Sequence, residues 1–162
     1  MLRTLVPALF LAAVQASGQA PDPAYLSLDR AYKALKNKDY DSAAAGFREA
    51  LRIAPGRAPV HKDLAYTLLK IGENEAARHQ FAEAMRLEPA DEHVALEYAF
   101  LCYETSHHAI ARRVFDRVRK NGNGTAEQAF QNIDGPLAEG IDRRKKALAM
   151  SPDNFSAHQE LA

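Results

Sequence analysis

Few residues in this chain stand at spacings that support chemistry. Its single cysteine, Cys102, lies in an apolar stripe at the position that Leu68 holds one sequence period earlier. Reactive cysteines need an exposed, electropositive setting, so this position favours a structural core thiol over a nucleophile. One cysteine also leaves no partner for a disulfide within the chain.

The six histidines do not stand at metal-binding spacings. His107 and His108 are adjacent, so on a helix they point to different faces and cannot share an ion as residues four apart would. The chain also has no HxxxH or CxxC pair, no GxSxG, no HExxH and no glycine-rich phosphate loop. We therefore expect a protein that is not an enzyme, with no catalytic residue, no metal site and no cofactor.

Composition restricts the class of protein. Acidic and basic residues balance at 21 each, which argues against a nucleic-acid binder, because such proteins usually carry a basic excess. With 47% hydrophobic and 26% charged residues, the chain is neither disordered nor fibrous. Runs of Val, Ile and Thr typical of strands are missing, and glycines and prolines lie mostly between periodic segments. This pattern predicts an all-α fold.

The first 20 residues differ from the rest of the chain. A short positive start, MLR, precedes the uninterrupted apolar run Leu5–Val14, and small and polar residues follow. This order is typical of a secretory signal peptide, and the run is shorter than the roughly 20 residues of a spanning helix. We predict cleavage after Ala16 or Ala20 and an exported protein, periplasmic or secreted, with no membrane span after signal removal. The alternatives are a buried N-terminal helix or an uncleaved anchor.

The rest of the chain, residues 21–162, is organised around a unit of two short amphipathic helices. In residues 58–91, Gly72 makes the turn between the helices and Pro89 ends the second one. Such a unit cannot bury its apolar faces alone, so it needs neighbours of its own kind. They are present, since the pattern AxxxFxxA occurs in two successive units and Pro55 closes the first as Pro89 closes the second.

The segment KNKDYDSAAAGFREALRIAP closely resembles the tetratricopeptide repeat (TPR). Its turn, its alanines Ala43 and Ala50, its aromatic Phe47 and its closing Pro55 stand at the spacing of that family. The resemblance implies a right-handed α-solenoid of antiparallel helix pairs. The repeats are expected at residues 24–57, 58–91, 92–120 and 121–154, with a partial fifth at 155–162.

The fourth and fifth units are irregular. We expect a short helix at Thr125–Ile133, a turn at Asp134–Pro136 and a second helix at Leu137–Met150. The partial fifth unit stops halfway through a helix, whereas repeat arrays finish with a polar capping helix. This predicts the N-terminal part of a longer protein, with an open C-terminal end that can self-associate. The alternative is a frayed terminal helix that serves as a minimal cap.

The first helices of the repeats carry the residues that we predict to bind a partner. In the TPR family these helices line a concave groove, where partners usually bind. The predicted groove residues form an acidic row and an aromatic row: Asp29, Tyr32, Asp63, Tyr66, Glu97, Phe100 and Tyr103. Spacings of three place each set on one helical face. Exposed aromatics with surrounding charge are typical of binding surfaces, and plain inter-helix packing is the alternative for the aromatics.

We expect a non-enzymatic protein–protein interaction or scaffold module of the cell envelope that binds a protein or peptide segment in this groove. The acidic row favours a segment with apolar and basic residues together. The carboxylate clamp of some TPR proteins, built of Lys, Asn and Arg, is not expected, because Asp63, His93 and Glu97 stand at corresponding places. The alternative function is an N-terminal accessory repeat region of a longer exported enzyme.

Overall fold

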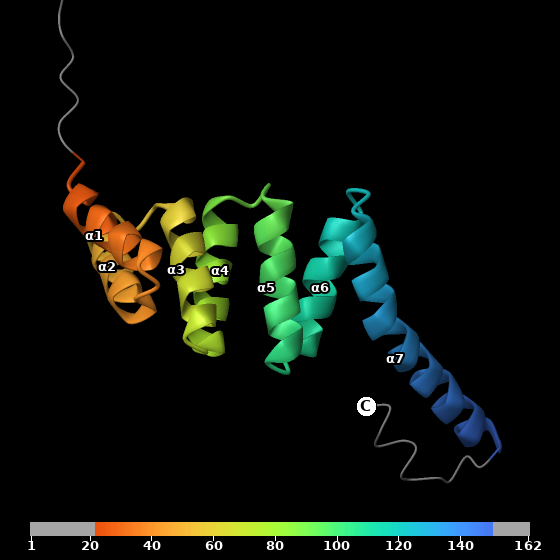
Figure 1. Ribbon diagram of the computed structural model, residues 1–162. Coiled ribbons are helices and arrows are strands. Elements are labelled where there is room, and N and C mark those ends of the chain that lie inside the picture. The colour runs from red at the N-terminus through yellow and green to blue at the C-terminus, as the bar shows by residue number, and fades with distance from the viewer. Residues whose placement is uncertain (1–21, 151–162) are drawn as a thin grey trace, which may run out of the picture.

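The computed structural model describes residues 22–150, and these form seven α-helices and no strand (Figure 1). The helices are, in chain order, α1 (Tyr25–Lys36), α2 (Tyr40–Ile53), α3 (Ala58–Lys70), α4 (Asn74–Leu87), α5 (Glu92–Glu104), α6 (His108–Arg119) and α7 (Gly124–Met150). They form a right-handed α-solenoid of antiparallel pairs, so the predicted fold class is confirmed.

Each regular unit of the solenoid is a pair of helices. The extensive contacts join α1 with α2, α3 with α4 and α5 with α6, and they join each pair to the helix that follows it. Figure 1 shows the pairs side by side along one axis, with α7 running away from the last pair. The packing is therefore local in sequence, as repeat arrays require.

The two helices of each pair are joined by a tight turn with one left-handed residue. Lys38, Gly72 and Ser106 follow one another at equal intervals along the chain and have φ angles of 61°, 81° and 64°. Glycine adopts this conformation without a steric cost, so Gly72 fits its turn best. The predicted turn at Gly72 is confirmed, and Pro55 and Pro89 closely follow the ends of α2 and α4 as predicted.

The alanine and phenylalanine positions of the repeats form the core. Phe47 and Phe81 are fully buried, and Phe115 is 1% exposed. Each of these rings contacts an aromatic ring on the first helix of its pair in an edge-to-face arrangement, at centroid distances of 4.9 to 5.1 Å. A Cβ on Gly46 of α2 would lie 2.8 Å from the Cβ of Ala31 on α1, so small residues allow these helices to approach closely. The alanine and phenylalanine positions that recur in the sequence are therefore the ones that the repeats bury.

The fourth unit differs from the prediction, because α7 is one continuous helix of 27 residues. Pro136 lies inside this helix, where the sequence predicts a turn. Proline removes the N–H that would bond the carbonyl of Asn132. The helix nevertheless continues past Pro136 without that bond. The prediction of a turn followed by a second antiparallel helix is wrong.

Two predictions lie outside the described residues, namely the signal peptide at residues 1–20 and the partial fifth unit at residues 155–162. Within residues 22–150, none of the helices combines the length and the hydropathy needed to cross a membrane.

Candidate functional site

All seven predicted groove residues lie on α1, α3 and α5, and the structure joins four of them between neighbouring repeats. The Tyr32 hydroxyl on α1 donates a hydrogen bond to Oδ2 of Asp63 on α3 at 2.5 Å. One repeat further on, the Tyr66 hydroxyl on α3 donates to Oε1 of Glu97 on α5 at 3.3 Å. We call the surface formed by α1, α3, α5 and the first half of α7 the groove face. On this face, a tyrosine of one repeat donates a hydrogen bond to an acidic side chain of the next repeat.

These surroundings keep both tyrosines protonated. Burial, and then the hydrogen bond to Asp63, raises the pKa of Tyr32 to about 12. Burial, and then the negative charge of Glu97, raises the pKa of Tyr66 to about 12 as well. Both hydroxyls are therefore hydrogen-bond donors at neutral pH.

The acidic row already has partners within the chain. Asp29 on α1 forms an ion pair with Lys33 of the same helix at 2.7 Å. Besides the Tyr66 hydroxyl, Glu97 has Nε2 of His93 at 3.7 Å, and this nitrogen lies 3.1 Å from the same hydroxyl. The carboxylates therefore offer fewer acceptor sites to a basic partner than the sequence pattern indicates.

The aromatic row combines a packing role with an exposed surface. Tyr32, Tyr66 and Phe100 each meet the core phenylalanine of their own repeat in an edge-to-face arrangement. Even so, Tyr32 is 44% exposed, Phe100 is 40% exposed and Tyr103 is 47% exposed. Part of each of these rings therefore packs against the core of its repeat, and the rest of the ring lies on the groove face.

Within residues 22–150, no tyrosine–acid pair joins α5 to α7 at the step between these last two neighbouring helices on the groove face. The Asn123 side chain caps the start of α7, as the Asp91 side chain caps the start of α5. When the two helices are aligned by these caps, Ala129 of α7 takes the place of Glu97 on α5. The aromatic residue on α5 at this step, Phe100, has no hydroxyl. Both polar partners are thus missing at the same step.

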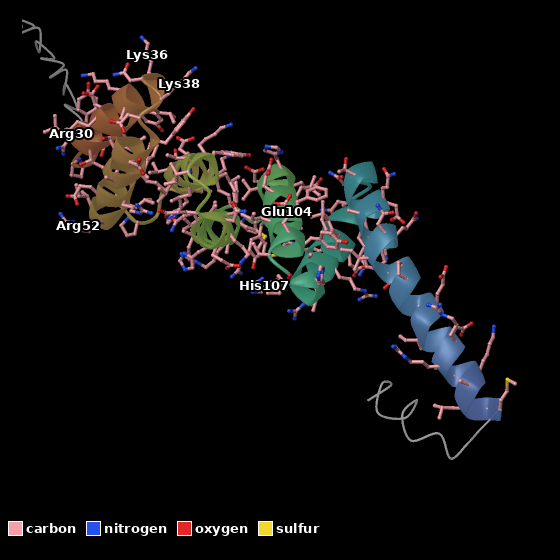
Figure 2. All side chains as sticks on the ribbon, turned by 60° about the horizontal axis from the view of Figure 1, so that its bottom comes forward. Arg30, Lys36, Lys38, Arg52, Glu104 and His107 are labelled. Atoms are coloured by element: carbon pink, nitrogen blue, oxygen red, sulfur yellow. The ribbon has the colours of Figure 1, made fainter. Side chains whose placement is uncertain are left out.

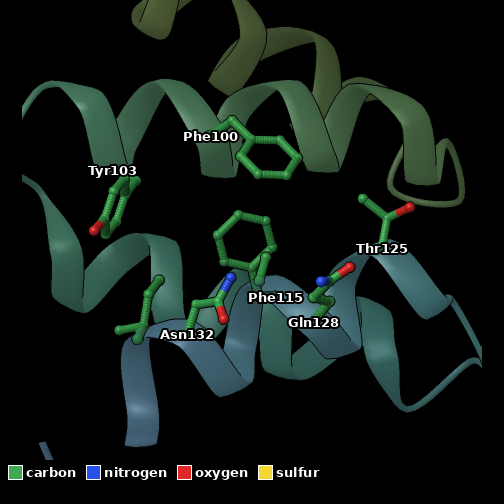
Figure 3. Close-up of a pocket in the computed structure, with 8 residues that line it drawn as sticks. Phe100, Tyr103, Phe115, Thr125, Gln128 and Asn132 are labelled. Carbon is green, nitrogen blue, oxygen red and sulfur yellow. The ribbon is translucent and has the colours of Figure 1, made fainter. Parts of the chain in front are cut away.

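A pocket of about 250 Å³ opens at this step. Figure 3 shows Phe100 of α5 above Phe115 of α6, with Gln128 and Asn132 of α7 on the other side of the Phe115 ring. The lining residues are Phe100, Tyr103, Phe115, Thr125, Gln128, Ala129, Asn132 and Ile133. Apolar walls with a few amide groups can take an apolar side chain and bond the peptide backbone next to it.

Most of this pocket was missed by the sequence-based prediction. Only Phe100 and Tyr103 belong to the predicted set, because the other lining residues come from α6 and α7. The signal that could have found them is Asn123, since asparagine is a preferred helix cap. It marks the start of α7 and so aligns Ala129 with Glu97.

Cationic side chains hold α7 against α6 beside the pocket. The guanidinium groups of Arg112 and Arg119 lie 5.0 and 4.1 Å from the centre of the Phe130 ring. Arg112 also forms an ion pair with Asp134, and Arg119 forms one with Glu127 at 3.2 Å. Cation–π contacts and ion pairs together attach the first half of α7, which forms one wall of the pocket.

The described residues offer little reactive chemistry. Cys102 is fully buried, and burial raises the pKa of its thiol, so the structural role predicted for it is confirmed. His61 is also buried, with Nδ1 at 2.7 Å from Oε1 of Gln80 and Nε2 at 3.0 Å from the Pro55 carbonyl. Within residues 22–150, no three His, Cys, Asp or Glu side chains are grouped so that they could hold a metal ion.

Comparisons with known proteins agree with the repeat architecture. A model of the tetratricopeptide repeat family matches residues 34–84. A sequence comparison with curated proteins finds no significant match. With the repeated turns, the alanine and phenylalanine core and this family match, the chain is a tetratricopeptide repeat protein.

Several solved structures are similar to this chain. The first TPR of Spaghetti (RPAP3), bound to an HSP90 peptide, has a TM-score of 0.57 at 16% identity, over 71% of this chain and 93% of that one. The MamA protein has a TM-score of 0.63 at 15% identity, over 85% of this chain and 78% of that one. The TPR2B domain of yeast Sti1, in a pHsp70 complex, has a TM-score of 0.55 at 17% identity, over 70% and 97%. At these identities the similarity concerns the fold.

Proposed function

We propose that this protein is a non-enzymatic interaction or scaffold module that holds a segment of a partner protein on its groove face. The pocket between α5 and α7 carries the proposal, because it opens on a face that also exposes Tyr32, Phe100 and Tyr103. Its volume of about 250 Å³ is smaller than the roughly 300–1,000 Å³ of small-molecule sites. It therefore suits one large apolar side chain of a peptide better than a free metabolite.

Two of the similar structures support a peptide as the ligand. The RPAP3 repeat contains an HSP90 peptide, and the Sti1 domain is in a pHsp70 complex. In the present chain, a Leu, Met or Phe side chain of the partner enters the pocket beside Phe100. The amide groups of Gln128 and Asn132 then bond the backbone of the partner segment.

We also propose that the module is exported and works in the cell envelope, in the periplasm or secreted. The support is the signal-like order of residues 1–20, in which a positive start, an apolar run and small residues follow one another.

Selection of 12-residue peptides displayed on phage, with the full chain as the target, tests the interaction function. We expect the selected peptides to share one position that holds Leu, Met or Phe. Ala129→Leu puts a larger side chain into the pocket, where it takes the space of the peptide's apolar side chain. It should therefore weaken the binding of a selected peptide about tenfold or more, as the loss of a buried anchor does.

Ala138→Leu is the matched control, because Ala138 is exposed on the same helix and does not line the pocket. It should leave the affinity unchanged. Equal binding by the two variants, or no selected peptide at all, would overturn the pocket as the anchor site.

A further inference from the structure

A second pocket on the groove face is rich in lysine. It lies between the C-terminal ends of α1 and α3 and has a volume of about 340 Å³. Its lining residues are Leu35, Lys36, Lys38, Tyr40, Asp63, Tyr66, Thr67 and Lys70. Three lysines against one aspartate give these residues a net charge of +2 (3 − 1). The one carboxylate, that of Asp63, already accepts the hydrogen bond of Tyr32.

The three pocket lysines form no ion pair within residues 22–150, whereas Lys33 and Lys62 pair with aspartates at 2.7 and 2.9 Å. Figure 2 shows Lys36 and Lys38 extending from the same end of α1, away from Arg30. The positive charge of this pocket is therefore not balanced by contacts inside the described part of the chain.

Lys38 differs from the other two lysines of the pocket. Lysines in the last turn of a helix stabilise that helix by themselves, which accounts for Lys36 and Lys70. Lys38 lies beyond α1 with a φ of 61°, in the left-handed region that glycine adopts most easily, and the equivalent residues of the next two repeats are Gly72 and Ser106, with φ angles of 81° and 64°. The turn does not require a lysine, and neither the end of a helix nor an ion pair within residues 22–150 accounts for the Lys38 side chain beside the pocket.

We propose that this pocket binds two neighbouring acidic side chains of the partner segment, an inference that rests on the proposed function. Two carboxylates match the net charge of +2, and the Tyr40 hydroxyl adds a donor on the pocket wall. The lysines come from the end of α1, from the turn and from the end of α3, which suits two side chains better than one terminal carboxylate. The partner then has an acidic pair over α1 and α3 and an apolar anchor over α5 and α7. This is the opposite charge to the one that the acidic row predicts.

Lys38→Gly is the most informative variant, because glycine relieves the backbone while the charge is removed. We expect its melting temperature to stay equal or rise, and its affinity for a selected, C-terminally amidated peptide to fall about two- to fivefold. Arg30→Gln is the control: it removes one charge from another side of α1 and should leave the affinity unchanged.

Changes in the peptide complete the test. Replacing its acidic pair by glutamines should weaken binding to the unmodified chain and reduce the dependence of binding on salt. The same replacement should have no further effect on a variant that combines Lys36→Gln, Lys38→Gly and Lys70→Gln. That result would assign the acidic pair to these three lysines.

The outcomes separate this inference from the proposed function. Selected peptides that share an apolar position but no acidic pair would overturn the lysine pocket and leave the groove function intact. Binding that requires a free C-terminal carboxylate, or a glutamine effect of equal size in both chains, would also overturn the lysine pocket alone. Failure to select any peptide would overturn both proposals.

Discussion

Replacing Phe81 by alanine should destabilise the protein strongly. The side chain is fully buried on α4, and its ring lies 5.1 Å from that of Tyr66 in an edge-to-face arrangement. Because α4 packs against both α3 and α5, the truncation leaves a closed cavity between two repeats. Changes of this kind lower the free energy of unfolding by about 3–5 kcal/mol.

Phe100→Ala is the matched control for this prediction. Its ring is 40% exposed and borders an open pocket, so truncation leaves no closed cavity and costs only the transfer of the buried part, about 1–2 kcal/mol. Urea titration followed by circular dichroism measures both losses, and amide hydrogen exchange locates them along the solenoid. Equal losses for the two variants, or no loss for Phe81→Ala, would refute the core role of the repeated phenylalanines.

Two further predictions concern the start of the chain and its pH dependence. The protein isolated from its native compartment should lack the first 16 to 20 residues, as mass spectrometry would show. A cytosolic protein that still begins with Met1 would contradict export. The hydrogen bond from Lys62 lowers the pKa of Asp91, so its stabilisation is complete above the ordinary value of 3.8 and is lost as the pH falls through the lowered value. Stability should therefore fall less between about pH 5 and pH 2 in the Asp91→Asn variant than in the unmodified protein. The asparagine can still cap α5, so the variant loses only the ion pair. An equal fall in stability in the two proteins would contradict the ion pair.

The regular repeats could be predicted from the sequence because their signals are local. A proline such as Pro89 ends a helix wherever it follows one, and Gly72 takes the left-handed turn without cost. Alanine and phenylalanine recur at the same interval as the prolines, as in Phe47 and Phe81, and so show which faces meet. The structure buries these faces as predicted.

The irregular end and the bonding on the groove face could not be predicted in this way. A proline usually ends a helix, and no local signal in the sequence shows that α7 continues through Pro136. The bond from Tyr32 to Asp63 depends on how far one repeat is shifted against the next, which periodicity within a repeat does not define. For the same reason, the sequence indicated the acidic row but not the hydrogen bonds from tyrosines and the ion pair with a lysine that its carboxylates already form.

Isoleucine-methyl NMR of the full chain, titrated with a selected peptide, tests the central claim most directly. Ile133 lines the pocket between α5 and α7, and the other four isoleucines of the chain do not. We predict that the Ile133 methyl resonance shifts most on binding, because the apolar anchor of the peptide contacts it. A saturated complex in which the Ile133 methyl resonance does not shift would contradict the account. The contradiction would be strongest if the resonances of Ile53, Ile71, Ile110 or Ile141 shifted instead.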